Sequence, residues 1–147
     1  PPILRTVSLD PETRLVATQD GLEPFARAVL GFTPERAEDF DPDAPLLVMG
    51  STSDVLRWLD RVGAPRPAGS PARSGHARMW TLPGTRTAVV STDDAVGLNN
   101  IARALRHHGH RSYLVQDGHG RTIDVGVWED DTEPLRVEFA PVAVSQR

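Results

Sequence analysis

The feature that most constrains the fold is a continuous apolar run, Leu46–Gly50, followed by a hydroxyl-rich turn at residues 51–53. A run this short, with no polar residue alternating through it, is typical of a strand buried on both faces of a sheet. The hydroxyl-bearing residues after it suit the capping position of a helix over residues 54–62. The run therefore predicts an α/β domain with helices covering its sheet.

The remaining chain repeats strand and helix patterns. Strand patterns cover residues 4–9, 14–19, 77–82, 86–91, 111–116, 122–128 and 135–139. Helical spacing occurs over residues 22–30 and again after Asp94. In this last helix Leu98, Ile101 and Leu105 form an apolar stripe, which we expect to pack on Val89, Val90 and Leu114.

These patterns predict a mixed, mostly parallel sheet flanked by about three helices, with an antiparallel C-terminal meander. The strand ending at Ser91, the helix after it and the strand over 111–116 form a βαβ candidate. A chain of 147 residues fits a single domain. Within it we expect an N-terminal hairpin plus helix (1–32), an acidic linker (33–45) and a main body (46–147).

Composition excludes several classes of protein. The 16 basic residues are all Arg, they are interspersed with acids, and the net charge is −4, so no basic stripe exists for nucleic acid. Cysteine is absent, which removes disulfides, thiolate zinc sites and a cysteine nucleophile. No apolar run approaches the roughly 18 residues that span a bilayer. We therefore expect a cytoplasmic protein that contacts neither nucleic acid nor membrane.

Familiar catalytic motifs are also missing. The sequence contains no His-Glu-x-x-His, no Gly-x-Ser-x-Gly, no phosphate-binding loop with Gly-Lys and no Gly-x-Gly-x-x-Gly. Serine, histidine and aspartate are all present, but nothing marks a nucleophile elbow or an oxyanion hole. We expect no cofactor and no catalytic residue.

Histidines gather at His107, His108 and His110, with His119 one hairpin away. Imidazoles bind zinc, nickel or copper, so His107, His110 and His119 are the candidate metal ligands. Adjacent helical residues point about 100° apart, however, so His107 and His108 do not easily face one ion. The alternative is a helix end, where imidazolium would interact favourably with exposed carbonyls and have a raised pKa.

Polar residues follow several of the expected strands. Open α/β sheets bind ligands at the edge where their parallel strands end. The candidate ligand-binding residues there are Ser51, Thr52, Ser91, Asp93, Asp94 and Asp117. Ser51, Thr52, Asp93 and Asp94 are also ordinary helix caps, which remains the competing interpretation.

About two thirds of the chain carries a recognisable succession of segments. They are Leu46–Gly50, the Ala-Arg-Met-Trp-Thr of Ala77–Thr81, Val-Val-Ser-Thr-Asp-Asp at 89–94, Leu-Arg-His-His-Gly at 105–109, Ser-Tyr-Leu-Val at 112–115 and Gly-Val-Trp at 126–128. This succession resembles the C-terminal non-catalytic α/β region of bacterial gluzincin-type zinc aminopeptidases. The chain departs from that pattern at Arg106, His108, Gln116 and Glu129. The resemblance implies an accessory domain whose zinc centre lies in another domain.

Together these observations predict a non-catalytic accessory or protein-interaction module of a peptidase-like protein or a multi-protein bacterial system. Its partner would be another protein or a covalently linked neighbouring domain, and a homo-oligomer is a further option. Two alternatives stay open: a small-ligand-binding α/β domain, and a hydrolase using His107, His108 and His110.

Overall fold

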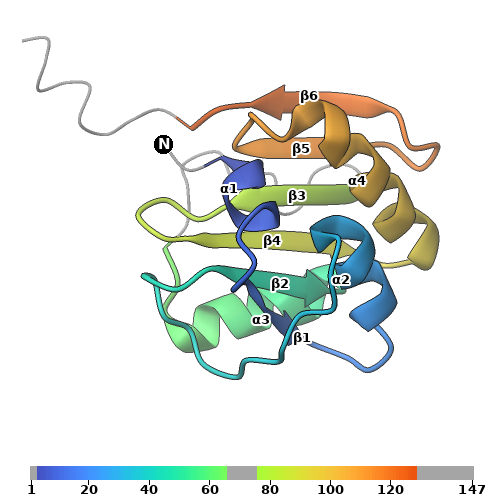
Figure 1. Ribbon diagram of the computed structural model, residues 1–147. Coiled ribbons are helices and arrows are strands. Elements are labelled where there is room, and N and C mark those ends of the chain that lie inside the picture. Colours follow the sequence, from blue (N-terminus) through green and yellow to red (C-terminus); the bar gives the residue numbers. More distant parts are fainter. Residues whose placement is uncertain (1–2, 66–75, 129–147) are drawn as a thin grey trace, which may run out of the picture.

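The computed structural model describes residues 3–65 and 76–128, which form a single mixed sheet with helices on both faces (Figure 1). The strand order is β1-β2-β4-β3-β5-β6. The strands are β1 (Arg14–Ala17), β2 (Leu46–Gly50), β3 (Ala77–Thr81), β4 (Thr87–Thr92), β5 (Tyr113–Gln116) and β6 (Thr122–Gly126). As the apolar run predicts, every residue of β2 is buried.

The four helices of the described residues divide between the two faces of the sheet. They are α1 (Leu4–Ser8), α2 (Glu23–Leu30), α3 (Thr52–Val62) and α4 (Ala95–His108). Figure 1 shows α1, α2 and α4 on one face and α3 on the other. Within these residues, no helix is both long enough and apolar enough to cross a membrane.

Strand directions confirm the predicted mixed α/β fold. β1, β2 and β4 pair in parallel, whereas β3 is antiparallel to both β4 and β5, and β6 is antiparallel to β5. β4 and β5 therefore run in the same direction with β3 between them. The predicted βαβ unit is present as β4-α4-β5, with its crossover passing over β3.

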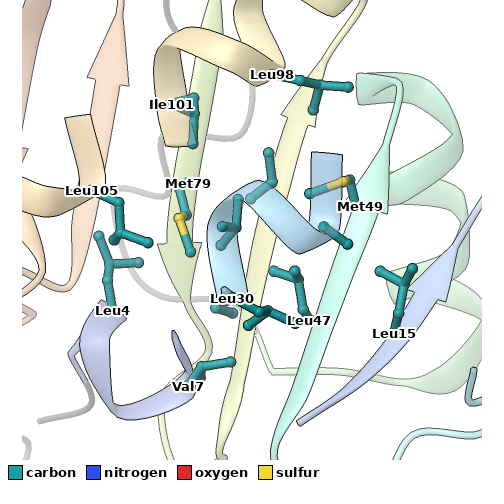
Figure 2. Packing of buried hydrophobic residues seen from close by; sticks show 14 of the residues in the cluster. Leu4, Val7, Leu15, Leu30, Leu47, Met49, Met79, Leu98, Ile101 and Leu105 are labelled. Atoms are coloured by element: carbon teal, nitrogen blue, oxygen red, sulfur yellow. The ribbon is translucent and has the colours of Figure 1, made fainter. Parts of the chain in front are cut away.

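Each face of the sheet has its own apolar core. Leu98, Ile101 and Leu105 of α4 belong to the core that α1 and α2 share, as Figure 2 shows. Val90 and Leu114 lie in this core as predicted, but Val89 does not: it belongs to the opposite core, under α3. The reason is the two-residue period of a strand, which points neighbouring side chains to opposite faces.

The predicted N-terminal hairpin is wrong. Residues 4–8 form α1 rather than a strand, and β1 pairs with β2 instead of with residues 4–9. Leu4 and Val7 are three positions apart, so one helical turn buries both in the core shared with α2 and α4. The backbone N–H groups of Leu4 and Arg5 donate to the carbonyls of Arg111 and Gly109 (both 2.8 Å), which anchors the helix.

The segment predicted as an acidic linker also covers an edge of the sheet. Leu15 N donates to Glu35 O, and Ala37 N donates to Leu15 O, both at 2.8 Å, on the outer side of β1. Phe40 packs edge-to-face on Trp58 of α3, with ring centroids 6.4 Å apart. These contacts protect β1 as a sheet edge and fix residues 35–40 beside α3.

At the opposite end of the sheet, Trp128 follows β6 and belongs to the core under α3. Its ring stacks on Tyr113 at 4.6 Å, and its Nε1–H donates to Thr81 O at 2.9 Å. Trp128 therefore lies on the face of the sheet opposite Val125, which packs on the other core. The strand expected at 135–139 lies outside the described residues.

Candidate functional site

The carboxyl edge of the sheet is the edge where β1, β2, β4 and β5 end and where β3 begins. The predicted ligand-binding residues lie at or directly after the strands that end there, as the α/β rule requires. These are Ser51 and Thr52 after β2, Ser91, Asp93 and Asp94 at the end of β4, and Asp117 after β5.

The first of these side chains connect α3 to the loop after β4. Ser51 is the N-cap of α3, and its Oγ accepts a hydrogen bond from Asp54 N at 3.3 Å. Thr52 N donates to Asp93 Oδ1 at 3.2 Å. This bond joins the loops that follow the parallel strands β2 and β4. Thr52 and Asp93 both lie at or next to the start of a helix.

Asp94 uses both carboxylate oxygens. Oδ1 accepts from Gly97 N at 2.7 Å as the N-cap of α4, and Oδ2 lies 2.8 Å from His76 Nε2. The Gly97 bond is the main cause of a lowered Asp94 pKa, and His76 adds to it. Sequence reasoning missed His76, because only the antiparallel direction of the strand that follows it brings His76 to this edge.

Arg78 is the second residue that sequence reasoning missed. It stands in β3 between strands β4 and β5, only 4% exposed. Its Nη1 donates to Thr52 Oγ1 at 2.7 Å and to Ser91 Oγ at 3.2 Å. Burial lowers its pKa, and the nearby Asp93 carboxylate opposes that shift. The available signal is a charged residue inside a mostly apolar strand.

Asp117 holds the turn between β5 and β6. Its Oδ1 accepts from His119 N at 2.8 Å and from Arg121 N at 3.0 Å, and its Oδ2 accepts from Arg121 Nε at 3.1 Å. The backbone bonds, Arg121 first, lower the Asp117 pKa. The carboxylate is thus committed to the turn. The carboxyl edge as a whole is a network in which the expected ligand groups bond to the protein itself.

The four clustered histidines do not assemble into one site. His107 and His108 end α4, and His110 follows it, whereas His119 sits in the β5–β6 turn at the carboxyl edge where α4 begins. The 14-residue helix separates these two ends by about 20 Å. Within residues 3–65 and 76–128, no three His, Asp or Glu side chains gather closely enough to hold a metal ion.

His108 also departs from the expectation of a raised pKa. Burial lowers its pKa, and the nearby Arg111, His107 and His110 lower it further. Burial, together with the surrounding positive charge, outweighs the attraction of the helix end for a cation. Folding therefore favours the neutral imidazole of His108 relative to the unfolded chain.

A separate open cavity of about 550 Å³ lies beside β1, and we call it the α3 groove. Its floor is formed by Val16, Ala17 and Thr18, and one wall by residues 36–39. The other wall is a face of α3 that presents Asp54, Arg57, Trp58 and Arg61, which recur at helical spacing. The volume falls within the range of ligand pockets in proteins, about 300–1,000 Å³.

Charge is distributed unevenly around the α3 groove. Arg36 pairs with Glu23 at 2.6 Å, and Arg57 pairs with Asp54 at 3.0 Å. Glu38, Asp39 and Arg61 form no ion pair among the residues that the structure describes. Sequence reasoning missed the groove because its two walls are joined only by the tertiary contact of residues 35–40 with β1 and α3.

Comparison of the chain with protein families, curated proteins and solved structures finds no match. Its function is therefore inferred from the geometry of its own residues. Two features are available for that inference: the internally bonded carboxyl edge and the open α3 groove.

Proposed function

We propose that this domain is a non-catalytic accessory module that binds a segment of a partner protein, or of a linked neighbouring domain, in the α3 groove. The observation that carries the proposal is the groove itself. It is open, lined by charged side chains and about 550 Å³ in volume. Enclosed small-molecule sites are mostly apolar, so a charged and open groove favours a polypeptide segment over a small apolar ligand.

The carboxyl edge supports the non-catalytic part of the proposal. A general acid or base must reach the substrate proton with a free ring nitrogen or carboxylate oxygen. Asp94 already binds Gly97 and His76, and Asp117 already binds its own turn. The small-ligand alternative loses support for the same reason, because a ligand would have to displace these intramolecular bonds.

Association with a peptidase is a further part of the proposal, and it rests on the resemblance of residues 45–137 to the accessory region of gluzincin-type aminopeptidases. A bacterial and cytoplasmic setting belongs to the same proposal. The absence of cysteine and the exclusive use of Arg as the basic residue are consistent with it.

The experiment has a catalytic arm and a binding arm. Purified protein is incubated with aminoacyl chromogenic substrates, with and without zinc, and only background release is expected. Turnover that survives purification and disappears in His107→Ala would overturn the proposal in favour of the hydrolase alternative.

In the binding arm, a library of random short peptides is selected on the wild-type protein. We expect enriched peptides whose binding is weakened in Arg61→Glu and unchanged in Arg103→Glu, a matched exposed arginine on α4. A library that yields no enriched peptide, or peptides indifferent to Arg61→Glu, would contradict the groove as the binding site.

A further inference from the structure

The two walls of the α3 groove carry opposite unpaired charge. Glu38 and Asp39 lie in the segment beside β1, and Arg61 lies on α3, whereas Arg57, one turn before it, is paired with Asp54. All four residues are exposed. A ligand lying between the walls therefore meets an anionic side and a cationic side.

Residues 37–40 are held beside β1 and α3 by two contacts. Ala37 N is bonded to Leu15 O at 2.8 Å on one side of the groove, and Phe40 rests edge-to-face on the buried Trp58. Among the described residues, no ion pair or hydrogen bond connects Glu38 or Asp39 with Arg57 or Arg61. The opposite charges therefore line the groove without pairing with each other across it.

We infer that the α3 groove selects a peptide segment that carries both an acidic and a basic residue. The acidic residue lies toward Arg57 and Arg61, and the basic residue lies toward Glu38 and Asp39. This inference rests on the proposed function, and it adds the chemistry of the segment that is bound.

Repulsion supplies much of the selectivity. An all-acidic segment places like charge against Glu38 and Asp39, and an all-basic segment places like charge against Arg61. Complementary charge steers association, and like charge suppresses wrong partners. Because the charges are exposed, each favourable pair contributes little, so we expect preferences of about two- to tenfold that weaken with added salt.

The test uses four capped peptides of equal length: one with acidic and basic ends, one all-acidic, one all-basic and one with serine in place of every charge. Binding to the whole chain is measured by calorimetry at low ionic strength. Wild-type protein is expected to bind the mixed peptide most tightly.

Charge reversal then moves the preference in opposite directions. Arg61→Glu leaves only acidic unpaired charge and should bind the all-basic peptide best. Glu38→Arg combined with Asp39→Arg should bind the all-acidic peptide best. Arg103→Glu, outside the groove, should keep the wild-type order. Thermal melts establish that each exposed substitution leaves the protein folded.

The outcomes separate the two claims. Groove-dependent binding in which the mixed peptide has no advantage, or in which neither charge reversal changes the order, would overturn the charge inference and leave the proposed function standing. Library peptides indifferent to Arg61→Glu would overturn the proposed function itself.

Discussion

Asp94 joins two elements through one carboxylate, as the cap of α4 and the partner of His76 before β3. Asp94→Ala removes both contacts, and loss of an N-cap costs about 0.5–2 kcal/mol of unfolding free energy. Asp94→Asn is the matched control, because its amide oxygen still accepts from Gly97 N. Denaturant titrations near neutral pH should therefore place the Asn variant between the Ala variant and wild type.

The stabilising effect of Asp94 depends on pH. Its pKa is lower in the folded than in the unfolded protein, so its contribution is present above the unfolded value, about 3.9, and is lost as pH falls through the folded value. The stability difference between wild type and Asp94→Ala should shrink below about pH 4. An unchanged difference there would contradict the assigned role.

His108 should also reduce stability in mild acid, for a different reason. Its lowered pKa means that the unfolded chain takes up the proton first, so stability falls as pH drops through the unfolded value, about 6.5. His108→Gln removes this term, and its stability should decline less than that of wild type between about pH 7 and about pH 5. A steeper decline in the variant would restore the interpretation of a stabilising helix-end cation.

Gly50 marks a close approach between the ends of β1 and β2. A Cβ added there would lie 1.7 Å from Thr18 Oγ1 and 3.0 Å from Thr18 Cβ. Gly50→Ala should cost about 1–3 kcal/mol, as overpacking generally does. Adding Thr18→Ala should recover part of that loss in a urea titration. Equal stability of Gly50→Ala and wild type would show that the strands separate easily.

At the residue scale, the sequence predicts polar side chains at the carboxyl edge but not their use. Because parallel strands end at the same edge of a sheet, hydroxyl and carboxyl residues that follow such strands are expected at that edge. The location of His76 and Arg78 at that edge is not predicted, because β3 is antiparallel and its first residues, rather than its last, reach the edge. Their bonding partners depend on contacts between strands that no local pattern contains.

The element that the sequence predicts best is α4. Its cap, apolar spacing and end all match the structure, because a long amphipathic helix is specified by local periodicity. Ile101 is fully buried in the core that Figure 2 shows, whereas Val96 on the same helix is 59% exposed.

This contrast gives a paired test of α4. Ile101→Ala should lower the free energy of unfolding by about 2–5 kcal/mol through lost burial and a cavity. Val96→Ala should stay within about 0.5 kcal/mol of wild type. Urea denaturation of both variants measures the difference. Similar values for the two would mean that α4 does not pack on the sheet as described.

The element that the sequence predicts worst is α1. Residues 4–9 satisfy a strand pattern and a single helical turn about equally, and a five-residue helix has little intrinsic stability. Its bonds to residues 109 and 111 and the burial of Leu4 and Val7 decide the outcome. Such tertiary contacts are invisible in a local window of sequence.

On the scale of the whole molecule, the α/β architecture follows from a buried parallel strand and a βαβ unit. The strand order does not, because the insertion of β3 between β4 and β5 requires knowledge of long-range pairing. The α3 groove is likewise a property of assembly. It exists only where the covered edge of β1 meets the side of α3.

The most direct test of a non-catalytic module that binds through the α3 groove is an NMR titration of isotope-labelled protein with the mixed-charge peptide. Amide shifts are expected to concentrate in residues 36–39 and 54–61 and to become smaller in Arg61→Glu at the same peptide concentration. Shifts concentrated instead around His76, Asp93 and Asp94 would contradict it and assign binding to the carboxyl edge.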